Sequence, residues 1–191
     1  MNTILVTGIG GPTPRSIAKT IRKYYKATRI IGVDANFKAI GFFIPGLLDK
    51  YYQVPRVENS DYWPFIKKLI NEEHVDMAFV QPEKEVIEWG NYYDMHGEFP
   101  CPVLIPPKKL AQSLMDKSIM ADLLSGTQYI PKTIKVSQDD PKFNEVEREI
   151  GFPCWIRATC GSGGLGSLKL LDISSYKSWL FINSAIKEFT I

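Results

Sequence analysis

The sequence predicts an α/β protein that begins with a Rossmann-like, mostly parallel sheet. Three observations lead to this prediction. Short β-branched and apolar runs alternate with segments in which apolar residues recur at helical spacing. The first run, residues 3–7, ends in glycines and is followed directly by a helical pattern. A second run, residues 30–33, ends at Asp34 about twenty-five residues after those glycines, as in a βαβ nucleotide-binding unit.

The other elements of the first part continue this alternation. Residues 16–25 are expected to form the first helix. Residues 62–71 carry an apolar stripe, with Lys67 and Lys68 facing away from it, and are expected to form a crossover helix. The remaining expected strands are residues 51–54, 76–80 and 103–105. Strands joined by helices in this way are expected to form a mostly parallel sheet with helices on its faces.

The glycine turn after the first expected strand has two interpretations. The sequence GIGGPTPR is not the dinucleotide motif G-x-G-x-x-G, because Pro12 and Pro14 occupy the turn and Arg15 stands where the third glycine would be. A packing turn and a ligand-binding turn are therefore about equally favoured. In the second case Gly10 and Gly11 are candidate substrate contacts.

Two acidic residues follow the strand expected at residues 76–80. Ligands gather at the carboxyl ends of strands in open α/β sheets, so Glu83 and Glu85 are possible site residues, and Glu83 is the substrate-contact candidate. Acidic residues in the first turn of a helix also complement the helix dipole. We favour the dipole interpretation about two to one.

The second part of the chain mixes helices with short strands. Residues 108–124 form an amphipathic pattern that predicts one continuous helix, which Gly126 ends. A strand is expected at residues 129–136 and a helix at residues 141–150. The remaining expected elements are a hairpin of residues 153–158 and 165–171, a helix within residues 172–187 with Ser174 or Ser175 near its N-cap, and an incipient strand at residues 188–191.

The loop of this hairpin is rich in small residues. Its members are Gly161, Ser162, Gly163, Gly164 and Gly166. Glycines let consecutive backbone N–H groups turn toward one point, where they form a nest for phosphate oxygens. Arg157, just before the loop, can add a charge-assisted fork to the same phosphates. Tight turns and surface hairpins use the same residues, so local chemistry alone leaves the two interpretations balanced.

Composition excludes several classes of function. The 191 residues are 45% hydrophobic and 23% charged, and the net charge of +2 gives no case for a nucleic-acid partner. Three cysteines without a CxxC pattern and two histidines argue against a disulfide framework or a metal site. The chain lacks a leader pattern and an 18-residue apolar span. We therefore expect a cytoplasmic protein with no membrane contact.

The hairpin GFPCWIRATCGSGGLGSLKLL resembles the glycine-rich loop of the ATP-grasp superfamily, and its opening is most similar to the carbamoyl-phosphate synthase large subunit. Most ATP-grasp proteins place lysine where this chain has Arg157, whereas the carbamoyl-phosphate synthase branch places arginine. Asp116 and Lys117 resemble the DK pair that opens the first catalytic subdomain. The segments VTGIGG, IIGVDAN, KYYQVPRV and DMAFVQPEKEV are similar to the preceding domain of these enzymes.

The resemblance implies a pre-ATP-grasp domain at residues 1–108 and an incomplete, α+β ATP-grasp domain at residues 109–191. It implies ATP and Mg²⁺ as cofactors, with the metal ligands expected beyond the chain end and none in this chain. Arg157 would be catalytic. The expected phosphate contacts are Lys117, Arg157, Gly161, Ser162, Gly163, Gly164 and Gly166.

The implied activity is that of a fragment or split subunit of an ATP-dependent carboxylate-amine or ammonia ligase of the carbamoyl-phosphate synthase type, working through an acyl phosphate. A small carboxylate or bicarbonate and an amine or ammonia would be substrates. A homodimer or a complementary subunit would be the partner. The chain alone is expected to be inactive and to bind ATP weakly or not at all. The alternatives are a non-catalytic nucleotide- or substrate-binding module and, least favoured, an NAD-type oxidoreductase using Gly8, Gly10 and Asp34.

Overall fold

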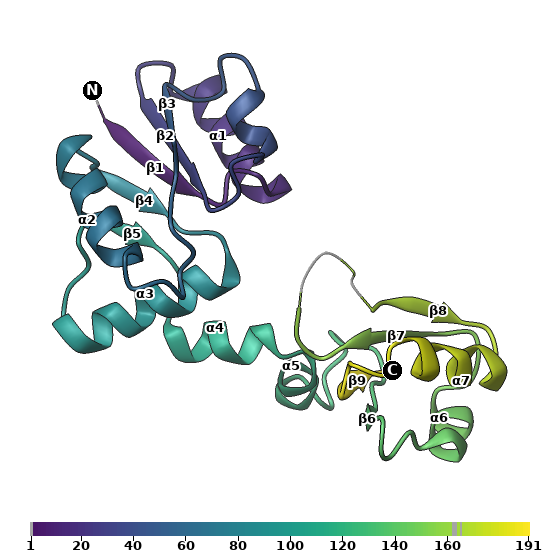
Figure 1. The fold of residues 1–191 in the computed structure, drawn as a ribbon. Helices are drawn as coiled ribbons and strands as arrows, with labels where there is room; N and C mark the ends of the chain where they lie inside the picture. The colour runs from purple at the N-terminus through teal and green to yellow at the C-terminus, as the bar shows by residue number, and fades with distance from the viewer. Residues whose placement is uncertain (1, 162–163, 165) are drawn as a thin grey trace. The chain divides into compact units, whose positions relative to one another are not determined.

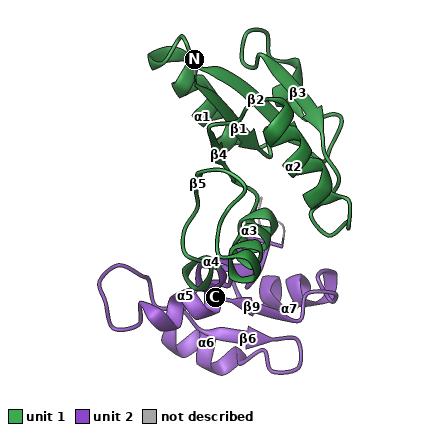
Figure 2. Ribbon diagram, turned by 90° about the vertical axis from the view of Figure 1, so that its left-hand side faces the viewer, with its two compact units in different colours: residues 1–111 green, residues 112–191 purple. Residues whose placement is uncertain are grey.

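A computed structural model describes residues 2–161, 164 and 166–191. The chain divides into two compact units, Met1–Ala111 and Gln112–Ile191 (Figures 1 and 2). The domain boundary expected at residue 108 falls just before this division. Each unit has its own sheet and its own buried core.

The sheet of the first unit has five strands, all parallel to their neighbours. Its strands are β1 (Thr3–Thr7), β2 (Arg29–Asp34), β3 (Lys50–Gln53), β4 (Met77–Phe79) and β5 (Val103–Leu104). Their order is β3-β2-β1-β4-β5, so the chain moves outward in one direction from β1 and then in the other from β4 (Figure 1). The predicted parallel α/β sheet is therefore confirmed. The strand order reverses between β1 and β4, where open α/β sheets bind their ligands.

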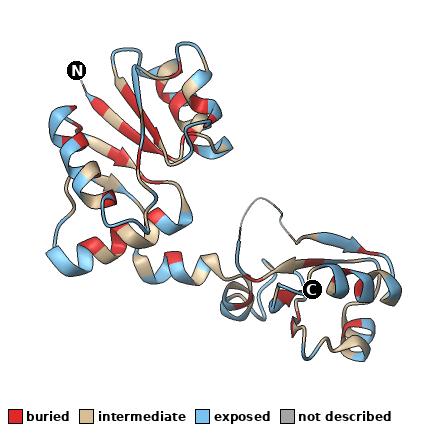
Figure 3. Cartoon of the chain, viewed as in Figure 1, coloured by how far each residue is buried: buried red, intermediate tan, exposed pale blue. Residues whose placement is uncertain are grey.

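Helices cover both faces of this sheet. The helical elements are α1 (Pro12–Tyr24), η1 (Ile40–Phe43), α2 (Tyr62–Glu72) and α3 (Glu83–His96), and α4 (Lys108–Met115) runs across the division between the units. Successive strand residues face opposite sides. Val6 packs with α1 on one side, whereas Leu5 packs with α2 and α3 on the other. Figure 3 shows the buried positions along these strands. Helix α1 begins before residue 16 because Pro12 and Pro14 fit a first helical turn.

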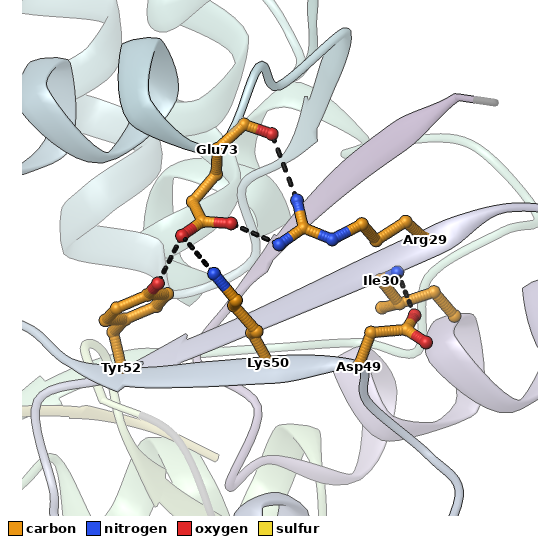
Figure 4. Close-up of polar contacts among 6 residues, drawn as sticks. All are labelled: Arg29, Ile30, Asp49, Lys50, Tyr52 and Glu73. Atoms are coloured by element: carbon orange, nitrogen blue, oxygen red, sulfur yellow. Dashed lines mark hydrogen bonds and ion pairs between the residues drawn. The ribbon is translucent and has the colours of Figure 1, made fainter.

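A charged cluster joins α2 to the amino ends of β2 and β3. Glu73 follows α2, and its carboxylate accepts hydrogen bonds from Tyr52, Arg29 and, at 2.9 Å, Lys50 (Figure 4). A second Arg29 nitrogen donates to the Glu73 carbonyl oxygen at 3.1 Å. This cluster lies at the strand ends opposite to those that face the glycine turn, so it stabilises the fold away from the candidate site.

The second unit is built on a four-stranded antiparallel sheet. Its strands are β6 (Lys135–Ser137), β7 (Cys154–Ala158), β8 (Leu168–Leu170) and β9 (Glu188–Thr190), in the order β6-β9-β7-β8. The helices are α5 (Lys117–Leu123), α6 (Phe143–Glu149) and α7 (Ile173–Ile182). The core joins the inner face of the sheet to α6 and α7 through Ile156, Phe189, Val146 and Trp179.

Two expected elements of the second part differ from the structure, and the start of a third is defined more closely. The continuous helix over residues 108–124 is interrupted at Asp116, whose extended backbone (φ −96°, ψ 114°) ends one helix and caps α5. The strand expected at residues 129–136 is reduced to the short β6. The N-cap of α7 is Asp172, and Ser175, which was expected near the N-cap, completes a capping box with it.

Candidate functional site

The N-terminus of α5 is held by Asp116. One carboxylate oxygen accepts hydrogen bonds from the backbone of Ser118 at 2.8 Å, its hydroxyl at 2.6 Å, and the backbone of Ile119 at 3.3 Å. Partial burial opposes the charge, but these hydrogen bonds lower the pKa of Asp116. The other carboxylate oxygen faces the Cys160 thiol at 3.7 Å. Asp116 thus fixes α5 against the start of the glycine-rich loop.

Lys117 lies directly against that loop. Its backbone N–H donates to the carbonyl oxygen of Thr159 at 2.9 Å, and its ammonium group donates to the carbonyl oxygens of Thr159 at 3.2 Å and Gly161 at 2.9 Å. The side chain is half-buried and is therefore not a freely solvated helical lysine. The structure brings together the two expected phosphate-binding features, which are forty-four residues apart in sequence.

Arg157 lies on the outer face of the second sheet, the face opposite to the core. Ile156 is fully buried and points inward, so its neighbours Trp155 and Arg157 point outward. Strand register places Lys169 opposite Trp155, and Thr190 opposite Arg157. Paired residues share a face, so these side chains share the outer face. Among the described residues, the Arg157 guanidinium forms no hydrogen bond or ion pair.

The described glycines of the loop have different structural roles. Gly161 (φ 108°), Gly164 (φ 75°) and Gly166 (φ 70°) all adopt the left-handed region that favours glycine. A Cβ atom at Gly161 or Gly164 would meet nothing within 4 Å, whereas one at Gly166 would lie 2.5 Å from Ile186. Gly166 therefore has a packing role, whereas Gly161 and Gly164 border open space and are favoured only by their backbone conformation. The expected contacts Ser162 and Gly163 lie outside the described residues.

A second candidate site lies at the carboxyl ends of β1, β2 and β4 in the first unit. The carboxylate of Asp34 accepts hydrogen bonds from the backbone N–H of Gly10 at 2.8 Å and of Asn36 at 2.8 Å. A Cβ atom at Gly10 would approach that carboxylate to 3.0 Å, and one at Gly11 would lie 3.3 Å from the Gly8 carbonyl oxygen. Close packing therefore accounts for both glycines. Asp34 holds the turn instead of offering a free carboxylate to a ribose.

The two acidic residues at the start of α3 have opposite environments. Glu83 is exposed, whereas Glu85 is buried and accepts a hydrogen bond from the Tyr62 hydroxyl at 3.2 Å. Burial raises the pKa of Glu85 to about 7, the charge of Asp34 adds to the shift, and hydrogen bonds from Thr7 and Tyr62 oppose it. The signal for this burial was in the sequence, because residue 89, one helical turn later, is tryptophan.

The described residues of the two candidate sites include no metal-binding cluster. Within the described ranges of the chain, no group of three or more His, Cys, Asp or Glu side chains could hold a metal ion. The described side chains therefore do not fit the Mg²⁺ that the resemblance implies. None of the described helices is long and apolar enough to cross a membrane.

Comparison with solved structures identifies the same fold in several ligases. N5-carboxyaminoimidazole ribonucleotide synthetase, solved as an ADP complex, matches 99% of this chain with a TM-score of 0.65 and 13% identity. The biotin carboxylase domain of Hydrogenobacter thermophilus 2-oxoglutarate carboxylase, solved with MgADP and bicarbonate, matches 99% with a TM-score of 0.59 and 13% identity. D-alanine–D-alanine ligase from Bacillus anthracis matches all of the chain with a TM-score of 0.56 and 15% identity.

These neighbours are ATP-grasp ligases, and at such low identity the likeness shows a shared fold. The chain spans about half the length of these structures, covering 46%, 43% and 56% of them. No model of a protein family matches the chain. The expected α/β organisation, a mostly parallel sheet followed by an α+β part, is confirmed, and the structure adds that the second sheet is antiparallel.

Proposed function

We propose that this chain supplies the first part of an ATP-grasp ligase, including the phosphate-binding loop, and that Arg157 and Lys117 contact ATP. The observation that carries the proposal is the contact of Lys117 with the carbonyl oxygen of Gly161 at 2.9 Å. It joins the lysine of the DK pair to the glycine-rich loop within one compact unit. Arg157 lies on the strand that leads into the same loop, with no charged partner among the described residues.

The proposed chemistry activates a carboxylate. ATP with its metal ion would supply the phosphoryl group, and an amine or ammonia would then attack the acyl phosphate of a small carboxylate or bicarbonate. The guanidinium of Arg157 can form two parallel hydrogen bonds to phosphate oxygens, whereas the ammonium of Lys117 acts as a compact charge. Both would stabilise negative charge that develops during transfer. Loop amides at Gly161 and Gly164 would orient the same oxygens.

The carbamoyl-phosphate synthase type is the finer part of the proposal. Arginine rather than lysine at residue 157, within the sequence GFPCWIR, supports it. The metal ligands would come from a complementary polypeptide or a further segment, because the described side chains offer no metal cluster. In this proposal the ligase acts in the cytoplasm on small molecules, as a homodimer or with that complementary subunit. A non-catalytic nucleotide-binding module would share the same phosphate contacts.

A titration of the ¹⁵N-labelled chain with ATP–Mg²⁺ tests the proposal, because NMR detects even weak binding. We expect amide shifts at Lys117, Gly161 and Gly164. Arg157→Ala and Lys117→Ala should each weaken the apparent affinity by about tenfold or more, because a hydrogen bond to a charged group contributes at least about 1.5 kcal/mol. Arg148→Ala on α6 removes an exposed arginine and is the matched control. Equal affinity of the Arg157 and Arg148 variants, or shifts confined to other regions, would overturn the assignment.

A further inference from the structure

Thr190 has a buried hydroxyl group without a partner. Its side chain is 2% exposed, and its Oγ1 is the one buried side-chain oxygen or nitrogen in the described part of the chain that lacks a hydrogen bond. A buried polar group that makes no hydrogen bond lowers stability. Strand propensity favours threonine, but valine has the same shape and a similar propensity without this cost. The hydroxyl therefore calls for a functional explanation.

The strand register places this hydroxyl between two basic side chains. Thr190 on β9 lies opposite Lys135 on β6 and opposite Arg157 on β7, so all three share the outer face of the sheet. Lys135 has a partner, because its ammonium lies 3.3 Å from the carboxylate of Glu188. Arg157 has none among the described residues. An unpaired acceptor thus lies beside a side chain with five unpaired N–H donors.

We infer that Thr190 is a positioning residue for Arg157: its Oγ1 accepts a guanidinium N–H when Arg157 turns to bind phosphate. This inference rests on the proposed function. Accepting one N–H would fix the plane of the guanidinium and leave its other donors as a fork for the phosphate oxygens. Directly opposed residues are about 5 Å apart at their Cα atoms, within reach of an arginine side chain that folds along the sheet. Thr190 itself need not touch the ligand.

A double-mutant cycle in the full chain tests the inference, with ATP–Mg²⁺ as the probe and apparent affinity from NMR titration as the readout. Thr190→Val should weaken binding about fivefold, the factor for one hydrogen bond, while its melting temperature stays the same or rises. Thr190→Ser should restore the affinity. In the Arg157→Ala background Thr190→Val should change nothing further, because the acceptor acts through the arginine. If the Thr190→Val protein does not fold, Thr190→Ala, which removes the same hydroxyl, takes its place in the cycle.

A spectroscopic measurement examines the hydrogen bond itself. With ATP–Mg²⁺ present, the side-chain N–H resonances of Arg157 should exchange slowly with water in the wild-type and serine proteins and rapidly in the valine protein. If Arg157→Ala weakens binding but Thr190→Val does not, the inference is wrong and the proposed function stands. If the two substitutions weaken binding additively, Thr190 does not act through Arg157. If the wild-type chain shows no ATP-dependent shifts, the proposed function fails and the inference with it.

Discussion

The hydroxyl group of Tyr62 donates a hydrogen bond to the carboxyl group of Glu85 at 3.2 Å inside the core of the first unit. Trp89 in turn donates its indole N–H to the Tyr62 oxygen at 2.9 Å. The hydroxyl of Thr7 also forms a hydrogen bond with this carboxyl group, and the negative charge of Asp34 raises its pKa. An acidic side chain thus joins β1, α2 and α3 at the strand ends where the sheet order reverses.

This arrangement predicts a stability that falls as pH rises toward neutrality. Burial raises the pKa of Glu85 to about 7 in the folded chain, from 4.5 when unfolded. Below pH 4.5 both states hold the proton and Glu85 causes no penalty. Between pH 4.5 and 7 only the unfolded state loses it, so stability falls with rising pH, by about 3 kcal/mol in total, and then levels off.

Glu85→Gln should remove this contribution. Urea unfolding of both proteins at pH 5 to 8 should give a difference in unfolding free energy that grows in favour of the glutamine variant as pH rises. Glu83→Gln, at an exposed position of the same helical turn, should follow the wild-type curve. Parallel curves for the wild type and Glu85→Gln would mean that Glu85 does not titrate in this range.

Glu73 should give the opposite pH dependence. Hydrogen bonds from Tyr52, Lys50 and Arg29 lower its pKa to about 2, although burial opposes them (Figure 4). A carboxyl group with a lowered pKa stabilises the fold above its unfolded value of 4.5, and that contribution is lost as pH falls from 4.5 toward 2. Glu73→Gln should cost about 2 kcal/mol at pH 7, as for other hydrogen bonds to a charged group.

Unfolding of the Glu73→Gln protein at pH 7 and pH 3 measures this contribution. The difference from wild type should shrink at pH 3, because the wild-type carboxylate is then losing its advantage. Glu72→Gln is the control. Glu72 is the residue before Glu73; its carboxylate is exposed and forms a long ion pair with Lys68 at 3.8 Å. A difference that is equal at both pH values would indicate a loss of packing instead of charge.

The glycine-rich loop offers a comparison between strain and steric clash. Gly164→Ala should cost about 1 to 2 kcal/mol, because alanine disfavours its positive φ. Gly166→Ala should cost more, since its Cβ atom would also lie 2.5 Å from the end of the Ile186 side chain. Thermal unfolding of the two variants measures whether Gly166→Ala loses more stability than Gly164→Ala. An equal loss of stability would mean that Ile186 moves aside without cost.

The pattern of apolar residues predicted those strands and helices whose sequences are set by burial in the core. The strands around residues 4–7 and 30–33 were recognised because both faces are buried, which requires continuous apolar runs. The break at Asp116 was missed, because the apolar spacing continues through it. Only the extended backbone of Asp116 and its capping hydrogen bonds separate the helices.

The residues of the candidate site could be predicted only where they belong to a sequence motif. The loop was named from its glycines and Lys117 from a resemblance, but their contact depends on a fold that no local pattern contains. Thr190, which we infer to position Arg157, was not named from the sequence, because a single threonine in a strand carries no signal of its own. The alternation of Phe189 and Thr190 indicates the outward face, but the pairing with Arg157 comes from the sheet register. Long-range register is a property of the folded chain, so the sequence alone left it undetermined.

Trp155 should report ligand binding on the outer face. It is 56% exposed, and it lies two residues from Arg157 on the same face of β7, whereas Trp89 and Trp179 are buried. A nucleotide held by Arg157 would cover the indole and protect it from a soluble quencher such as acrylamide. ATP–Mg²⁺ should therefore reduce the quenching of the wild-type emission, with the midpoint moved to higher ATP in Arg157→Ala. The Trp155→Phe protein should show no response, because its remaining tryptophans lie in the cores or partly buried beside them. An undiminished response in Trp155→Phe would place the nucleotide away from this face and would remove the outer face of the sheet from the proposed site.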